Sequence, residues 1–161
     1  MSDFRYSSSD VDPVVLCIDD DPDISETIAL RLQHRGAKVL RAFHGMHGLQ
    51  LAMTRRPKLI ITDLRMPQGG GSYIIERLRS HPDTRSVPII ILTGQRRLDL
   101  PHTARRLRVN QVLTKPIHFD DLAAAIGRFI PLKSRDANWP RISAVRSQKN
   151  DLTHNEISRD A

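Results

Sequence analysis

Short runs of aliphatic residues alternate along this chain with longer stretches in which apolar side chains recur every three or four positions. An apolar run of about four to eight residues is typical of a buried strand, whereas the longer spacing is typical of an amphipathic helix. The pattern therefore predicts five strands, each followed by a helix. The predicted strands are 14–18, 37–42, 59–62, 88–92 and 111–114, and the predicted helices are 24–35, 45–56, 72–80, a stretch near 98–108, and 119–130.

Helix breakers support these boundaries. Gly36 follows the first predicted helix, Pro57 follows the second, and Pro101 restricts where the fourth can begin. Five strands alternating with five helices imply an α/β fold with a parallel sheet, doubly wound so that helices cover both faces. Ligands on such sheets bind beyond the carboxyl ends of the strands, so functional side chains are expected directly after each strand.

Length and composition add a division into three regions. A chain of 161 residues with 39% hydrophobic residues is expected to form one domain with a packed core and some surplus. Residues 13–130 hold nearly all the aliphatic runs and are predicted to be the folded domain. Residues 1–12 and 131–161 lack this periodicity and are expected to be arms that are disordered or loosely attached. The charges of the two arms cancel, so the formal net charge of +7 belongs to residues 13–130.

Composition also excludes several classes of protein. The single cysteine, Cys17, excludes a disulfide framework and a cysteine-based zinc site, and its place in a predicted strand indicates a small buried hydrophobe. No apolar run approaches the ~20 residues of a membrane span. The polar N-terminus lacks the apolar core of a secretory signal, so a cytoplasmic location without membrane association is expected.

Carboxylates, a hydroxyl and an ammonium follow four of the predicted strands. Asp19 and Asp20 follow the first strand, Asp63 the third, Thr93 the fourth and Lys115 the fifth. Clustered carboxylates repel one another, and Mg²⁺, which prefers oxygen ligands and is commonly shared with a phosphate, relieves that repulsion. The lysine and the threonine could bind other phosphoryl oxygens, and Asp63 could be the nucleophile that forms an aspartyl-phosphate.

A simpler structural role has to be weighed for each residue alone. An aspartate after a strand is usually a helix cap or turn residue, and Asp21 before Pro22 is expected to be such a cap. A single threonine or lysine at a strand end is more often solvated than functional. The joint placement of all these groups at one edge of the sheet favours a phosphoryl site.

The strand-end residues resemble the receiver domain of two-component response regulators, including single-domain regulators of the chemotaxis type. The likeness runs from about Val14 to Ile130. The matching motifs are Val15-Leu16-Cys17-Ile18-Asp19-Asp20-Asp21-Pro22, Ile61-Thr62-Asp63-Leu64-Arg65-Met66-Pro67, Ile91-Leu92-Thr93-Gly94 and Leu113-Thr114-Lys115-Pro116.

The resemblance implies a flavodoxin-like sheet with strand order 2-1-3-4-5. It implies that Asp63 accepts a phosphoryl group from a sensor histidine kinase or a histidine phosphotransfer protein. Asp19, Asp20, Asp63 and the backbone carbonyl of Arg65 would hold Mg²⁺. Thr93 would be the switch hydroxyl and Lys115 its cationic partner. Pro116 would follow a cis peptide bond.

Three positions depart from the family pattern. Val112 stands where the family often has an aromatic switch residue, so the usual coupling between the hydroxyl and a ring is not expected. The loop at 68–71 carries three glycines and is expected to be mobile. Gln95 and Arg65 lie two positions after Thr93 and Asp63, where the family tunes the access of water to the phosphoryl group.

Other features allow both a functional and a structural explanation. An arginine cluster surrounds the fourth predicted helix and would meet an acidic output partner or nucleic acid on the face formed by the fourth helix, fifth strand and fifth helix, or be simply solvated. Without a helix-turn-helix or zinc-finger pattern, the sequence does not favour direct DNA binding. His44 and His47 are expected to have structural or surface roles and not to bind a metal. Trp139 in the tail could dock on the domain or on a partner, but a solvated tail is the simpler expectation. The clustered arginines are Arg96, Arg97, Arg105, Arg106 and Arg108.

The sequence thus predicts a stand-alone, non-enzymatic response regulator whose output is a change in partner binding, as a monomer or weak dimer. The tail at 131–161 is too short for a typical output domain. Two alternatives remain. One is an adaptor of the same fold that signals without phosphorylation, and Val112 favours it slightly. The other is an aspartyl-phosphate hydrolase, which lacks the usual Asp-x-Asp arrangement after the first strand.

Overall fold

Five parallel strands form one sheet in the order β2-β1-β3-β4-β5. The structure is a computed structural model that describes residues 11–67, 70–95 and 99–134. The elements in chain order are β1 (Val14–Ile18), α1 (Pro22–Gln33), β2 (Lys38–Ala42), α2 (Gly45–Arg55), β3 (Leu59–Asp63), α3 (Gly71–Ser80), β4 (Ile89–Thr93), α4 (Leu100–Leu107), β5 (Gln111–Thr114) and α5 (Phe119–Gly127). The predicted alternation, fold class and strand order are confirmed.

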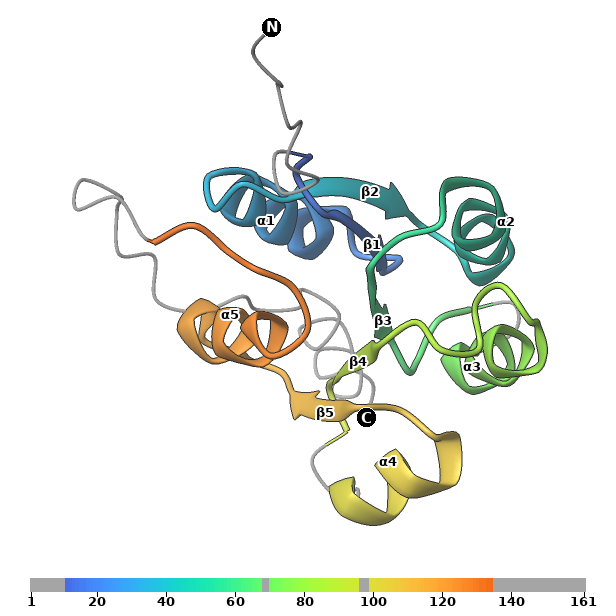
Figure 1. The fold of residues 1–161 in the computed structure, drawn as a ribbon. Helices are drawn as coiled ribbons and strands as arrows, with labels where there is room; N and C mark the ends of the chain where they lie inside the picture. The colour runs from blue at the N-terminus through green and yellow to red at the C-terminus, as the bar shows by residue number, and fades with distance from the viewer. Residues whose placement is uncertain (1–10, 68–69, 96–98, 135–161) are drawn as a thin grey trace, which may run out of the picture.

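The helices form a layer on each side of the sheet, with α1 and α5 on one face and α2, α3 and α4 toward the other (Figure 1). Because successive side chains of a strand point to opposite faces, each central strand contributes to both layers. In β1, Val15 and Cys17 pack toward α1 and α5, while Leu16 and Ile18 pack toward α2 and α3.

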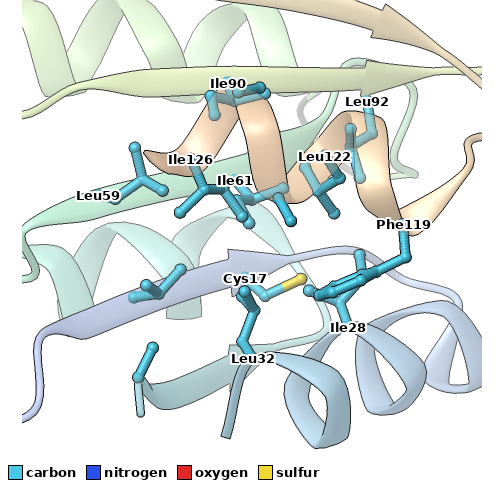
Figure 2. Packing of buried hydrophobic residues seen from close by; sticks show 14 of the residues in the cluster. Cys17, Ile28, Leu32, Leu59, Ile61, Ile90, Leu92, Phe119, Leu122 and Ile126 are labelled. Carbon is cyan, nitrogen blue, oxygen red and sulfur yellow. The ribbon is translucent and has the colours of Figure 1, made fainter. Parts of the chain in front are cut away.

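The core beneath α1 and α5 is aliphatic with one aromatic ring (Figure 2). Ile28 and Leu32 of α1 meet Leu122 and Ile126 of α5 over the strands, and the ring of Phe119 covers the end of this cluster near Cys17. Cys17 is 1% exposed, which confirms the buried hydrophobe expected from the sequence. Burial, together with the nearby carboxylate of Asp19, raises the pKa of the Cys17 thiol to about 12.

The ends of two helices show why the boundaries moved from the predicted ones. Asp21 is the N-cap of α1 and accepts hydrogen bonds from the backbone N–H groups of Asp23 and Ile24, so the helix begins at Pro22 and not at residue 24. Asp99 caps α4 in the same way by accepting from the N–H of His102 at 3.0 Å. Pro101 is compatible with this start because the first turn of a helix has no intrahelical use for its N–H.

The chain after α5 folds back onto the domain instead of leaving it at once. The N–H of Lys133 donates to the carbonyl of Arg35 at 2.9 Å, and Nε of Arg35 donates to the carbonyl of Lys133 at 3.1 Å. Leu132 packs against the core, and Gly36, at φ +75°, lies under the Lys133 side chain. The first residues of the predicted C-terminal arm are therefore attached. Residues 135–161, with Trp139, lie outside the described residues, as do 1–10.

Two further expectations concern the backbone and the helices. The peptide bond between Lys115 and Pro116 is cis, as the resemblance implied. In the described part of the chain, no helix combines the length and the apolar character that crossing a bilayer needs.

Candidate functional site

Three carboxylates meet at the carboxyl edge of the sheet. Asp19 follows β1, where its N–H continues the ladder to the carbonyl of Ala42, and Asp63 is the last residue of β3. With Asp20 they each offer an oxygen, and these oxygens lie within 4.8 Å of one another. Asp19 and Asp63 are 2% and 7% exposed, so most of this negative charge is withdrawn from water.

Lys115 brings one positive charge into the same space. Its Nζ donates to Oδ2 of Asp19 at 2.7 Å and to Oδ2 of Asp63 at 3.1 Å, with 5% of the lysine side chain exposed. Residues 19, 63 and 115 come from the ends of three strands. The topology, with β1, β3 and β5 in one parallel sheet, is therefore what brings them together.

The pKa values reflect this crowding. Burial raises the pKa of Asp19, and the carboxylate of Asp63 raises it too, although Lys115 opposes both effects. Burial by itself lowers the pKa of Lys115, but the carboxylates of Asp19 and Asp63 outweigh burial and raise that pKa overall. Three carboxylates and one ammonium leave a net negative pocket that a cation would stabilise.

Backbone N–H groups fix the remaining carboxylate oxygens. The N–H of Arg65 donates to Oδ1 of Asp63 at 3.0 Å, and the N–H of Asp21 donates to Oδ1 of Asp19 at 2.9 Å. Each buried carboxylate is thus held at both oxygens, one by backbone and one by Lys115. Such fixed geometry suits a group that has to present one oxygen to a reactant.

Thr93 ends β4, the strand next to β3, and is fully buried. Its Oγ1 accepts a hydrogen bond from the N–H of Gln95 at 3.2 Å, which turns the hydroxyl toward the loop after β4. The carbonyl of Thr93 accepts from the N–H of Lys115 at 2.7 Å. The backbone therefore links Lys115 to Thr93, and Thr93 ends the strand that pairs with β3, the strand that ends in Asp63.

Gly71 is a positioning residue that the sequence reasoning missed. A Cβ at this position would overlap the carbonyl oxygen of Asp63 and would lie 2.8 Å from the Cα of Leu64. The N–H of Gly71 also donates to the carbonyl of Leu64 at 3.1 Å. The glycine run at 69–71 predicts a mobile loop, whereas Gly71 lets α3 begin in contact with the end of β3. The mobility expected for 68–71 falls partly on residues 68 and 69, which lie outside the described residues.

The other singled-out residues take structural positions. Val112 is 7% exposed and packs in the core beneath α3 and α4, opposite Ile91. His44 caps α2 by accepting at Nδ1 from the N–H of His47, and the two rings lie 5.6 Å apart. In the described residues, the one group of three or more potential metal ligands is the aspartate cluster, to which neither histidine belongs. Arg96 and Arg97 lie outside the described residues.

The donor set fits a hard divalent cation. All three side chains offer carboxylate oxygens, two of them are buried, and sulfur and imidazole ligands are absent from this cluster. Mg²⁺ is bound in proteins through one or two carboxylates together with waters and phosphate oxygens. Asp19, Asp20 and Asp63 would hold it. The backbone carbonyl of Arg65, proposed as a further ligand, stays a prediction.

Comparison with known proteins gives consistent matches. The family model described as the response regulator receiver domain matches residues 15–127. The chain is 32% identical over 136 residues to the DNA-binding dual master transcriptional regulator RpaA of Synechocystis, a match that covers 84% of this chain but only 56% of that protein. It is 25% identical over 120 residues to sporulation initiation phosphotransferase F of Bacillus subtilis, covering 74% of this chain and 95% of the relative.

Solved structures agree in fold. The chemotaxis protein CheY4 of Vibrio cholerae matches with a TM-score of 0.69 at 25% identity, over 74% of this chain and 99% of that one. A response regulator from Chloroflexus aurantiacus matches with the same TM-score at 29% identity, over 73% and 97% of the two chains. The matched part is the region of alternating strands and helices described above.

Proposed function

Because the chain belongs to the response regulator receiver domain family, the phosphoaccepting module of two-component signalling, we propose that it accepts a phosphoryl group on Asp63 with the help of Mg²⁺. Receiver domains bind Mg²⁺ at an acidic pocket, interact with histidine kinases or phosphotransfer proteins, and are signalling modules rather than enzymes.

The single observation that carries the proposal is the environment of the Asp63 carboxylate. It ends a buried strand, one oxygen is fixed by the N–H of Arg65, and the other contacts Lys115 at 3.1 Å. A structural aspartate at a strand end would need one cap contact and would not need a buried ammonium shared with a second carboxylate.

The transfer itself is a displacement at phosphorus. An oxygen of the Asp63 carboxylate attacks the phosphorus of a phosphohistidine, the O–P bond forms, and the P–N bond breaks with its electron pair returning to the imidazole. The ammonium of Lys115 would form an ion pair with one of the new phosphoryl oxygens, and the hydroxyl of Thr93 would donate a hydrogen bond to another. A bound Mg²⁺ would neutralise charge on the phosphoryl oxygens.

Phosphorylation adds negative charge at Asp63, and this charge is what couples the site to the rest of the domain. A Thr93 hydroxyl drawn toward the phosphoryl group would give up its bond from Gln95, so the loop after β4 would move. The response would be a shift between two conformations of this loop and of α4.

The test is labelling by acetyl phosphate with and without Mg²⁺. We expect Asp63→Asn to lose the label. Asp83→Asn, which changes an exposed aspartate at the opposite edge of the sheet, should be labelled as fully as the parent chain. Removal of Mg²⁺ with a chelator should abolish labelling of the parent chain. Labelling of Asp63→Asn at the parent level would show that the acceptor is another residue.

A phosphorylation-independent adaptor is the second candidate, and the position of Val112 favours it. The Val112 side chain is buried in the core, and Val112 pairs with Ile91 of β4. Because valine has no ring, this position cannot report the state of Asp63 by a movement of an aromatic side chain. Beryllofluoride with Mg²⁺ separates the two candidates. Shifts of the Thr93 and Lys115 amide resonances support the phosphorylated switch, whereas an unchanged spectrum supports the adaptor.

The remaining proposals concern partners. We propose a receiver that acts without an output domain of its own, supported by the relative from Bacillus subtilis, 95% of which the match covers. The output face would be α4, β5 and α5, where a hollow of about 500 Å³ lies between β5 and α5 and where Arg105 and Arg106 are exposed. A monomer or weak dimer, an acidic partner and a cytoplasmic location stay predictions.

A further inference from the structure

Basic side chains gather at the edge of the sheet opposite the aspartate site. In a parallel sheet, the loops that lead into the strands all lie at the amino edge. Five exposed cations occur at or just before strand starts, and we call them the basic edge: Lys38, Arg56, Lys58, Arg85 and Arg108.

Backbone contacts place these five cations in one row. The N–H groups of Lys38 and Lys58 donate to the carbonyls of Pro13 and Val14, on either side of β1. Arg56 and Lys58 line a hollow of about 330 Å³ together with Asp83 and Ser86, next to Arg85 in the chain. 

The guanidinium of the buried Arg79 connects the other end of the row. It donates to the carbonyls of Arg85 and Arg108 at 3.1 and 2.7 Å, and so holds these two exposed cations on neighbouring loops. The basic edge therefore runs across the sheet from β2 to β5.

The positive charge of the basic edge is poorly compensated. In the described part of the chain, Asp12 and Asp83 are the acidic residues of the loops at this edge, and Asp12 lies 3.6 Å from Lys133. Among the described residues, no ion pair within 4.0 Å involves any of the five cations. Burial lowers the pKa of Arg79, and the positive charge of Arg108, whose carbonyl lies 2.7 Å from Nε of Arg79, lowers it further.

Two of the five cations are kept at a cost to the backbone. Arg56 and Arg108 adopt left-handed conformations at φ 47° and 52°, just after α2 and α4, where glycine is the residue without strain. The helix dipole favours cations at helix ends and accounts for part of this charge. It does not account for Lys38, Lys58 and Arg85, which lie outside the helices.

We propose that the basic edge binds the phosphate backbone of double-stranded nucleic acid without reading its bases. The row spans four gaps between strands, roughly 19 Å, and would face about five or six phosphates of one strand. Of the exposed large apolar side chains of the described residues, Val11 lies at this edge, in the segment before β1. The others lie outside the loops that enter the strands, and they are Leu30, Phe43, Met46 and Tyr73. A protein partner or a membrane surface would be expected to use such apolar anchors, whereas phosphate contacts need only charge.

The proposal is tested by the anisotropy of a labelled 20-base-pair duplex titrated with the full 161-residue chain. If each of the five cations neutralises one phosphate, the plot of log affinity against log salt has a slope of about −4.5, which is about a 500-fold loss between 50 and 200 mM salt. Two duplexes of unrelated sequence should bind equally. A tenfold preference for one sequence, or no binding at 50 mM salt, would overturn the proposal.

Charge reversal locates the surface. We expect Arg56→Glu/Lys58→Glu/Arg85→Glu to lower the affinity at least tenfold and to flatten the salt dependence. The matched control reverses three exposed arginines of α3 and α4, Arg77, Arg105 and Arg106, and should lose less than threefold. Equal losses, or a larger loss in the control, would assign the effect to net charge or to the α4 face and contradict the proposal.

Two additional measurements keep the outcome decisive. If the reversal variant does not fold, the neutral variant Arg56→Gln/Lys58→Gln/Arg85→Gln should still lose affinity in the same direction. Tighter binding of poly-glutamate or of phosphatidylserine vesicles than of the duplex would overturn the choice of nucleic acid. Acetyl phosphate labelling of each variant reports on Asp63 separately, so a failure here does not bear on the proposed phosphorylation.

Discussion

Replacing Lys115 by methionine is the sharpest test of the electrostatics of the aspartate site. The substitution keeps a long apolar side chain but removes the ammonium that lies 2.7 Å from Asp19 and 3.1 Å from Asp63. At an effective dielectric constant of about 20, each contact contributes a gross attraction of roughly 5 to 6 kcal/mol. Desolvation offsets most of it, and breaking a buried pair from one side typically costs about 3 to 5 kcal/mol in the free energy of unfolding.

Urea unfolding of the metal-free protein measures this cost, and Lys133 offers a matched control. We expect Lys115→Met to lower the free energy of unfolding by about 3 kcal/mol. Lys133 also contacts an aspartate, Asp12 at 3.6 Å, but 74% of its side chain is exposed. Because water and salt screen an exposed pair, Lys133→Met should cost less than about 1 kcal/mol.

Added Mg²⁺ separates the electrostatic explanation from lost packing. A cation that binds the same carboxylates stabilises the folded state by about 2.7 kcal/mol at 100 times its dissociation constant. The gain should be larger in Lys115→Met than in the parent chain, because Lys115 no longer reduces the negative charge. Replacing Asp19 and Asp63 by asparagine in the same chain should also restore most of the loss. If neither change reduces the difference in the free energy of unfolding between Lys115→Met and the parent chain, lost packing and not charge explains the effect, and the electrostatic explanation is refuted.

Two further predictions concern neighbouring groups. The pKa of Asp19 is raised from 3.8, and Mg²⁺ needs the ionised carboxylate. The Mg²⁺ affinity measured by calorimetry should therefore decrease as the pH is lowered through this raised pKa. A decrease confined to pH below 3.8 would contradict the prediction. In the metal-free protein the folded state holds this proton more tightly, so stability should rise over the same fall in pH. Gly71→Ala should destabilise the protein by about 1 to 3 kcal/mol in thermal unfolding, because the new Cβ overlaps the Asp63 carbonyl. Gly127→Ala, which has open space around its Cβ, should stabilise α5 by up to about 1 kcal/mol. Equal effects of the two substitutions would disprove the overlap.

The fold was predictable because the strongest signals in this sequence are local and agree with one another. Three of the five strands, β1, β3 and β4, are largely runs of apolar residues, and alternation with amphipathic helices leaves few topologies for a parallel sheet. The boundaries were less predictable because they depend on contacts that the pattern does not contain. The first helix begins earlier because Asp21 caps it, and the last ends at Gly127 because the following segment packs against Arg35.

The site was predictable in its members and less so in its geometry. Asp19, Asp63 and Lys115 could be expected together because parallel strands end at one edge, and the ion pairs that link them follow from that edge. Gly71 could not be assigned, because its close approach to Asp63 depends on where α3 begins. A glycine at the first position of a helix after a glycine run is compatible with both mobility and tight packing, and the sequence has no signal that separates them.

Topology also decides where the net charge of +7 is felt. Asp19, Asp20 and Asp63 lie at the carboxyl ends of the strands, while the basic edge lies where the chain enters them, so the parallel sheet places the acidic pocket and the basic edge at opposite ends. A linear count of charges places the basicity on residues 13–130 and, by proximity in sequence, on the arginines around α4. It cannot join Lys38 to Arg108, which are 70 positions apart in sequence and both at strand starts. The acidic pocket and the basic edge are therefore separate surfaces, and a negative charge added at Asp63 would leave the cations of the basic edge exposed to bind a second, anionic partner.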